Sequence, residues 1–433
     1  MRLKVNRIGY NGRLTLTSLF SVFVAWLPLF ASYYSYIPGF SVADIILTMF
    51  VALTLACKVR EKNEFIVKPN IIYLAMYLIV VFSLVSLIIQ KKALVFDVAI
   101  RIIRYFFYLS AVAVCGKRIF DAEITKRHIK LVSVLATVYV IIQYFLYTIF
   151  GYILKGFVTF WPLYESGYSS RNYAYYFNMM FRPTSFFLEP AHFSRYAAIG
   201  IAICLFEKEK ITGKRLFAAV FITIGVLIST SSQGYALLVV IWFIWVSKQL
   251  KGKANKWFRI VLILAVIASP IIIIKILPKL LQIEFISDTI RRTFTGSLAD
   301  KNTAIGARLG GVLEYIKLPL GYKIIGMGFG SIIDGVWFSS YIYFLYGAGV
   351  IVFVLYAVYL LMVYKSTSGL KRVIFILFAI LFITDDSFYS YMCIIFISLA
   401  FLKRKSNDNT EDRSIDEISV YSDRDKFGKR YLH

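Results

Sequence analysis

Residues 129–150 read IKLVSVLATVYVIIQYFLYTIF, and Lys130 is the only charged residue in this run. Apolar runs of similar length recur along the chain, and a helix of about 20 apolar residues crosses the hydrocarbon core of a bilayer. Hydrophobic residues make up 59% of the 433 residues, charged residues only 17%, and the mean hydropathy is +0.71. The sequence therefore predicts an all-α polytopic integral membrane protein.

The apolar runs predict about twelve transmembrane helices. They are expected at 14–30, 41–57, 70–89, 94–115, 129–150, 187–206, 215–231, 233–248, 257–277, 336–363, 371–384 and 387–402. The basic start of the chain leads into the first run with no cleavage site for a signal peptidase, so we expect an uncleaved first helix. Residues 1–402 should form one transmembrane domain, and the polar residues 403–433 a disordered cytoplasmic tail.

The net charge of +25 is concentrated in alternate connections between the runs. Examples are KVREKNEFIVK (58–68), GKRIFDAEITKRHIK (116–130) and EKEKITGKR (207–215). Cytoplasmic loops carry an excess of Lys and Arg, so both termini are predicted to be cytoplasmic. This pattern accounts for the positive charge without a nucleic-acid partner. Two long connections, about 151–186 and 278–335, then face outward. Their cations are either an ordinary solvated surface, the reading favoured for most of the lysines, or a surface for an anionic substrate at the membrane.

The stretch RPTSFFLEPAHFSRY (182–196) leads from the first outer loop into a predicted helix. Pro190 suits the first turn of a helix, where its missing N–H costs nothing. Glu189, His192 and Arg195 then fall on one helix face. Ionisable residues at this depth usually face a bundle interior or a water-filled cavity. Glu189 could act as a general base or orienting group, with Arg182 and Arg195 as anion clamps.

A structural reading of the same stretch stays open. In it, Glu189 forms an ion pair with Arg182 or Arg195 that anchors the helix. His192 could equally be catalytic or an interfacial histidine whose hydrogen bonds are satisfied.

Three other stretches carry polar groups. FDVAIRIIRY (96–105) spaces Asp97, Arg101 and Arg104 along one helix stripe, as an internal ion pair or as arginines that reach a buried anion. The polar residues from Ser229 to Gln233 are interpreted first as a hydrogen-bonded turn, although Gln233 could contact substrate. Residues 308–330 contain Arg308 and a Gly-x-Gly-x-Gly run, which we read as a flexible loop leading to the next span.

Metal chemistry is not expected from the sequence. Three histidines are too few for an obvious zinc cage, and the four cysteines lie within or at the ends of apolar runs. We therefore expect no disulfide, no metal site and no cofactor.

The set of motifs resembles the superfamily of O-antigen polymerases and O-antigen ligases. Its Arg-x-x-Ser-x-Phe-x-Glu-Pro motif is similar to residues 182–190, and its Thr-x-Ser-(Arg/Gln)-Gly turn to residues 230–234. A late-loop pattern is similar to Arg308, then Pro319-Leu320-Gly321, then Gly326 to Gly330. Gln233 stands where many members have arginine, and the spacing after Pro319 is longer than in many. No histidine lies between 278 and 335, although the ligases are expected to use one there, and this favours the polymerase branch.

The resemblance implies a metal-independent glycosyltransferase of the bacterial plasma membrane. Such an enzyme moves a glycan from undecaprenyl diphosphate to the sugar end of another lipid-linked repeat unit, for O-antigen, capsule or exopolysaccharide. The expected partners are these lipid-linked oligosaccharides, the bilayer, a flippase and a chain-length regulator. Glu189 and His192 are the catalytic candidates. The substrate-binding candidates are Arg182, Arg195, Arg308, Arg101, Arg104 and Gln233. The alternatives are a flippase or transporter for lipid-linked oligosaccharides, and an O-antigen ligase.

Overall fold

The structure is a computed structural model of the chain. It describes residues 15–60, 122–164, 181–251, 304–328 and 338–385 with gaps of one or two residues, position 336, and scattered positions between 81 and 121. Within these residues the fold is built from helices, and two isolated β-bridges pair residues of the connections between them. The helices are α1 (Leu16–Phe30), α2 (Val42–Arg60), α5 (Ala122–Phe150), α7 (Pro190–Phe206), α8 (Gly213–Ile228), α9 (Ser232–Lys251), α12 (Ala304–Lys317), α13 (Leu320–Ile325), α14 (Ser340–Ser366) and α15 (Gly369–Thr384).

Among the described helices, α5, α9 and α14 are long and apolar enough to cross a membrane, and α1, α2 and α7 are shorter apolar helices. These features support the predicted all-α membrane protein. The spans predicted at 70–89, 257–277 and 387–402 lie outside the described residues, and 94–115 lies largely outside them. The number of twelve spans and the orientation therefore stay predictions, as does the disordered tail.

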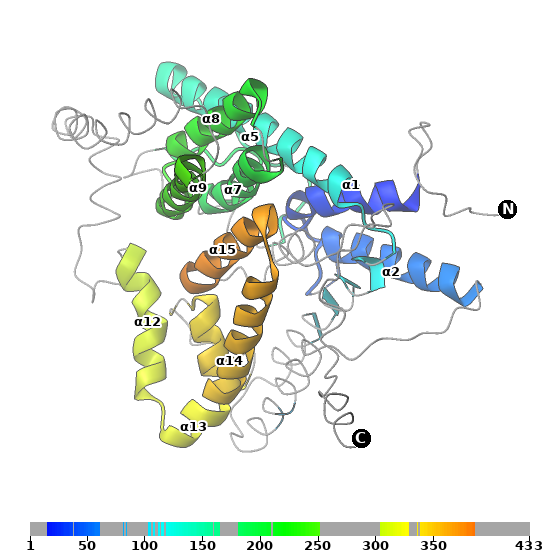
Figure 1. Cartoon of the computed structure of the whole chain (residues 1–433), viewed down its shortest axis with the longest axis vertical. Helices are drawn as coiled ribbons and strands as arrows, with labels where there is room; N and C mark the ends of the chain where they lie inside the picture. Colours follow the sequence, from blue (N-terminus) through cyan, green and yellow to red (C-terminus); the bar gives the residue numbers. More distant parts are fainter. Residues whose placement is uncertain are drawn as a thin grey trace, which may run out of the picture.

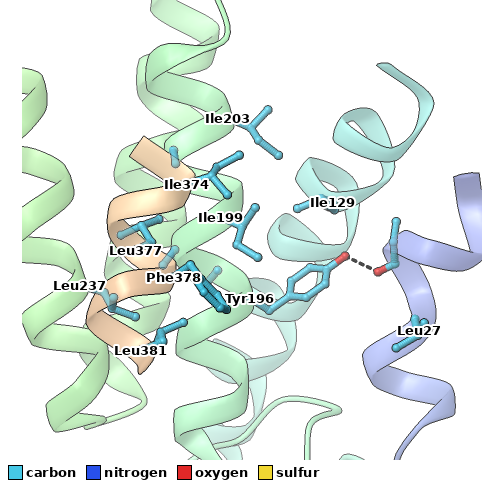
Figure 2. Close-up of a cluster of buried hydrophobic side chains, with 14 of the residues drawn as sticks. Leu27, Ile129, Tyr196, Ile199, Ile203, Leu237, Ile374, Leu377, Phe378 and Leu381 are labelled. Carbon is cyan, nitrogen blue, oxygen red and sulfur yellow. Dashed lines mark hydrogen bonds between the residues drawn. The ribbon is translucent and has the colours of Figure 1, made fainter. Parts of the chain in front are cut away.

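Helix α7 is the centre of the described core. Every residue from Phe193 to Phe206 is buried, and a helix that is apolar on all sides belongs in an interior. Figure 2 shows side chains of α1, α5, α9 and α15 packed around it. On the α1 side, the hydroxyl of Tyr196 donates a hydrogen bond to the carbonyl oxygen of Ala25 at 2.6 Å. Residues close to α7 are therefore held by several helices at once.

Small residues let these helices approach closely. Gly200 of α7 lies directly against Ser133 of α5. A Cβ added at Gly225 of α8 would stand 2.7 Å from Thr137 of α5. Small residues at such contacts are typical of helix packing in membranes, where van der Waals contact replaces the hydrophobic driving force. In Figure 1, α5, α7, α8 and α9 form one group.

A charged network closes one end of this group. Glu207, just after α7, pairs with Lys130 of α5 at 3.0 Å, with Lys126 of α5 at 3.3 Å and with Arg215 of α8 at 3.4 Å. Burial opposes ionisation of Glu207, but the hydrogen bonds and charges of Lys130 and Lys126 outweigh it and hold its pKa below the ordinary value. The predicted cytoplasmic connections 116–130 and 207–215 thus meet at the same end of the bundle.

The apolar run predicted as one span at 336–363 is interrupted. Gly349 has φ 77° and ψ 172°, which no α-helix accommodates. Phe344 and Tyr356 stack with ring centroids 5.0 Å apart, although twelve residues of straight helix would separate them by about 18 Å. The two halves of α14 therefore pack against each other across Gly349, and the 27 residues do not form one straight path.

The break in α14 is capped by the glycine run after α13. The amide of Met327 donates to the carbonyl of Tyr346 at 2.7 Å, and that of Gly328 donates to the carbonyl of Gly347 at 3.0 Å. These carbonyls lose their helical partners at the break, and in a membrane such groups need new ones. Residues 326–328 lie in a loop between α13 and α14, as the sequence predicted, and these hydrogen bonds tie that loop to α14. Gly330 lies outside the described residues. Helices α12, α13 and α14 lie together in Figure 1.

Replacing Gly349 by alanine is expected to destabilise the protein. Its backbone conformation is open almost only to glycine and costs other residues about 1–3 kcal/mol. An added Cβ would also collide with the carbonyl of Ile324. In a straight helix the same change would stabilise by about 1 kcal/mol, so the sign of the effect tests the break.

The measurement is the thermal unfolding temperature of the purified protein in detergent. Gly151→Ala is the control, because Gly151 has φ 63° but no neighbouring atom within 4 Å of an added Cβ. We expect Gly349→Ala to lower the temperature more than Gly151→Ala. An increase for Gly349→Ala would contradict the break.

Candidate functional site

Helix α7 begins at Pro190, as the sequence predicted, and Glu189 is its N-cap residue. The Glu189 side chain is half-buried and makes no capping hydrogen bond. Among the described residues its carboxylate forms no ion pair with Arg182 or Arg195, so the anchoring pair considered from the sequence is not formed there. A carboxylate at the start of a helix can accept a proton from a substrate when no neighbouring residue binds it.

The segment before α7 is held by α5. Ser185 has a positive φ of 58°, uncommon for a residue other than glycine. Gln143 of α5 fixes it on both sides: its oxygen accepts from the Ser185 amide at 2.8 Å, and its nitrogen donates to the Ser185 carbonyl at 3.3 Å. Gly156, in the connection after α5, also lies directly against the Ser185 carbonyl. Arg182 and Glu189 therefore stand on either side of a fixed backbone.

Arg182 reaches the turn between α8 and α9. Its Nε donates to the Thr230 hydroxyl at 3.2 Å, and its Nη2 donates to the Thr230 carbonyl at 3.2 Å. This is the hydrogen-bonded turn predicted at 229–233, and Thr230 has a positive φ of 51°. Gly234 lets the start of α9 approach α7 closely, because a Cβ added at Gly234 would lie 2.6 Å from the Ser194 hydroxyl of α7. Two stretches about fifty residues apart in sequence are thus joined.

Arg195 is buried in an ion pair with Asp385. The distance from Nε to Oδ2 is 2.7 Å, and the side chains are 3% and 9% exposed. The Gln233 amide donates to the same carboxylate at 3.0 Å. The Asp385 carbonyl accepts from the Ser340 amide at 2.7 Å and from the Ser340 hydroxyl at 2.6 Å. Asp385 therefore joins α7, α9, α14 and α15.

His192 lies on α7 among these charges. It is half-buried, and Glu189, Arg195 and Asp385 are all within electrostatic range of its ring. The structure thus brings five of the predicted residues to one region of the bundle: Arg182, Glu189, His192, Arg195 and Gln233.

Arg104 lies at a different place. Its guanidinium is 3.5 Å from the carboxylate of Asp44 in α2 and donates to the Tyr164 hydroxyl at 2.7 Å and to the Gly39 carbonyl. Asp44 is 2% exposed. The pair considered from the sequence was Asp97–Arg101, and both of its residues lie outside the described residues. The described ion-pair partner of Arg104 is Asp44.

Arg308 lies in α12, within the connection 278–335 that the sequence predicts to face outward. The structure places its position in the helix but does not describe its side chain. Helix α12 packs on α14, which carries Ser340, so the late-loop motif is connected with the Asp385 region through one helix.

Sequence reasoning missed Asp385, Asp44 and Gln143. Asp385 had a usable signal, since the connection TDDS contains only acidic charge and Arg195 needs a counter-ion. Asp44 and Gln143 gave no such signal. Within the part of the chain that the structure describes, no three His, Cys, Asp or Glu residues group as metal ligands would.

A scan against models of protein families and a search of curated proteins found no match to this chain.

Proposed function

We propose that this protein is a polysaccharide repeat-unit polymerase. It would transfer a glycan from undecaprenyl diphosphate to the sugar end of a second lipid-linked repeat unit at the outer face of a bacterial plasma membrane. The reaction would serve the synthesis of O-antigen, capsule or exopolysaccharide, and it would need no metal.

One observation carries the proposal: residues from separate motifs meet. Arg182 of the Glu-Pro motif binds Thr230 of the turn motif. Gln233 of the turn motif shares the Asp385 carboxylate with Arg195. The convergence of these motifs beside the half-buried Glu189 favours a site for an anionic substrate and an acid–base step.

The chemistry needs a base and a stabilised leaving group. The acceptor hydroxyl oxygen attacks the anomeric carbon of the donor sugar, and its proton passes to Glu189. The bond between that carbon and the diphosphate oxygen breaks, and its electron pair stays on the leaving undecaprenyl diphosphate. Cations that face this oxygen stabilise the developing charge. We assign Arg182 and Arg308 to this task.

Arg195 receives a different role in this proposal. Its guanidinium is nearly inaccessible and already paired with Asp385. We therefore regard it as a positioning residue that fixes α7, and with it Glu189 and His192.

The experiment uses a strain that lacks this gene. Wild type, Glu189→Gln, Arg182→Ala and Arg308→Ala are expressed at matched membrane levels, and the surface glycan is separated on a gel. We expect wild type to restore a ladder of repeats and each variant to give a single repeat. Lys317→Ala is the control in α12, because Lys317 is 69% exposed and pairs only with Glu314 among the described residues.

Other outcomes point to the alternatives. A null strain that shows no single repeat at its surface would favour the flippase. A null strain that makes polymer on the lipid carrier but does not attach it to the final acceptor would favour the ligase. A ladder from all three variants would contradict the assigned site.

A further inference from the structure

Two loops meet at the end of the bundle where α1 ends and α2 begins. The amide of Tyr34 donates to the Pro162 carbonyl at 3.0 Å, and the amide of Tyr164 donates to the Ser32 carbonyl at 2.9 Å. An isolated antiparallel bridge pairs Tyr33 with Leu163. The connection 31–40 and the predicted outer loop 151–186 are thus joined through their backbones.

The joined loops display three aromatic rings, which we call the aromatic platform: Tyr34, Tyr36 and Trp161. The ring centroids of Tyr34 and Tyr36 are 5.8 Å apart, and those of Tyr36 and Trp161 are 5.7 Å apart at an interplanar angle of 65°. Tyr36 is 64% exposed and Trp161 is 40% exposed. Two exposed rings at this angle form an open corner.

The platform is fixed in place. The Trp161 indole N–H donates to the Tyr34 carbonyl at 2.9 Å, so the loop that carries Tyr34 holds the Trp161 ring. Tyr36 has a positive φ of 63°, a conformation that costs a bulky residue free energy and often marks a functional position. Rigid aromatic rings bind with little loss of conformational entropy.

The platform is continuous with the candidate site. Gly156 packs against Ser185, three residues from Arg182. Two residues further on, the Val158 amide donates to the Tyr33 hydroxyl at 3.0 Å. One short segment therefore contacts both the arginine-bearing backbone and the platform loops.

We propose that the aromatic platform binds a sugar ring of the lipid-linked oligosaccharide. This inference rests on the proposed polymerase function. A pyranose has an apolar face and a rim of hydroxyl groups, and exposed Tyr and Trp rings offer a flat apolar surface with polar edges. Rings that only anchor a protein at the membrane interface need neither a fixed corner nor a strained backbone.

The direct test measures binding by saturation-transfer NMR. The purified protein is mixed with the oligosaccharide released by mild acid from the host's own lipid-linked repeat unit. We expect saturation of the sugar protons with wild type and with Trp161→Phe, and its loss with Trp161→Ala and Tyr36→Ala. Phe243→Ala on α9 is the control, because Phe243 is 69% exposed but lies on a membrane helix.

The kinetic test separates binding from structure. With lipid-linked acceptor, the two alanine variants should raise KM about tenfold and change kcat much less, as expected when uniform binding is lost.

Trp161→Phe keeps a ring but loses the indole hydrogen bond. If it behaves like Trp161→Ala, the indole is only a tie between loops and the proposal fails. It also fails if the alanine variants bind the sugar like wild type. A wild type that binds sugar but makes no polymer would instead overturn the polymerase function and leave the subsite standing.

Discussion

Glu189→Gln is expected to abolish polymerisation without destabilising the protein. Loss of a general base lowers the rate by about 100- to 10,000-fold. The folded state should tolerate the change, because the described structure gives this carboxylate no capping hydrogen bond and no ion pair. The measurement pairs the yield of glycan polymer with the thermal unfolding temperature in detergent.

Glu207→Gln supplies a matched control at the opposite end of α7. Glu207 lies in a network of three cations, and its pKa is held below the ordinary value of 4.5. Its ionised form therefore stabilises the folded state above that value, and this contribution is lost as the pH falls through the folded pKa. We expect Glu207→Gln to lower the unfolding temperature at neutral pH and to leave the rate per folded molecule nearly unchanged.

The two glutamate variants discriminate between chemical and structural roles. A Glu189→Gln protein that still makes long polymer would remove Glu189 from the reaction. A Glu189→Gln protein that unfolds as early as Glu207→Gln would show that Glu189 supports the fold instead.

Local signals allowed much of the fold to be predicted. The start of α7 at Pro190 and the sharp turn before α9 follow from the conformations that proline and short polar residues favour, and both predictions are confirmed. The break at Gly349 could not be found this way. Residues 336–363 read as one apolar run, and hydropathy does not distinguish a straight helix from one whose carbonyls are capped by a distant loop.

The sequence identified the cations of the candidate site but not the residues that pair with them. Motif spacing singled out Arg182, Glu189 and Arg195. The partner of a buried charge depends on tertiary packing, and Asp385 lies 190 positions after Arg195. Single-sequence reasoning sees neighbours on one helix, so it considered Glu189 as the partner, whereas the structure forms the longer-range pair.

Arg195→Met is expected to destabilise the protein by about 3–5 kcal/mol, because it leaves the buried Asp385 charge uncompensated. Asp385→Leu should cost a similar amount for the same reason. The double variant Arg195→Met/Asp385→Leu should recover most of this stability, since a buried ion pair can be replaced by apolar groups at little cost. Thermal unfolding of the four proteins in detergent measures the coupling between the two sites.

Lys317→Ala sets the scale for an exposed pair. Its ion pair with Glu314 is 2.8 Å long but mostly solvated at the lysine, so its loss should cost less than about 1 kcal/mol. Single variants at Arg195 and Asp385 that are as stable as Lys317→Ala would contradict the buried pair.

The double variant Arg195→Met/Asp385→Leu also tests activity. It should fold yet polymerise poorly, because Gln233 loses the carboxylate that orients it. A double variant that is both stable and fully active would mean that the pair serves the fold alone, and that α7 is positioned for the reaction by its packing.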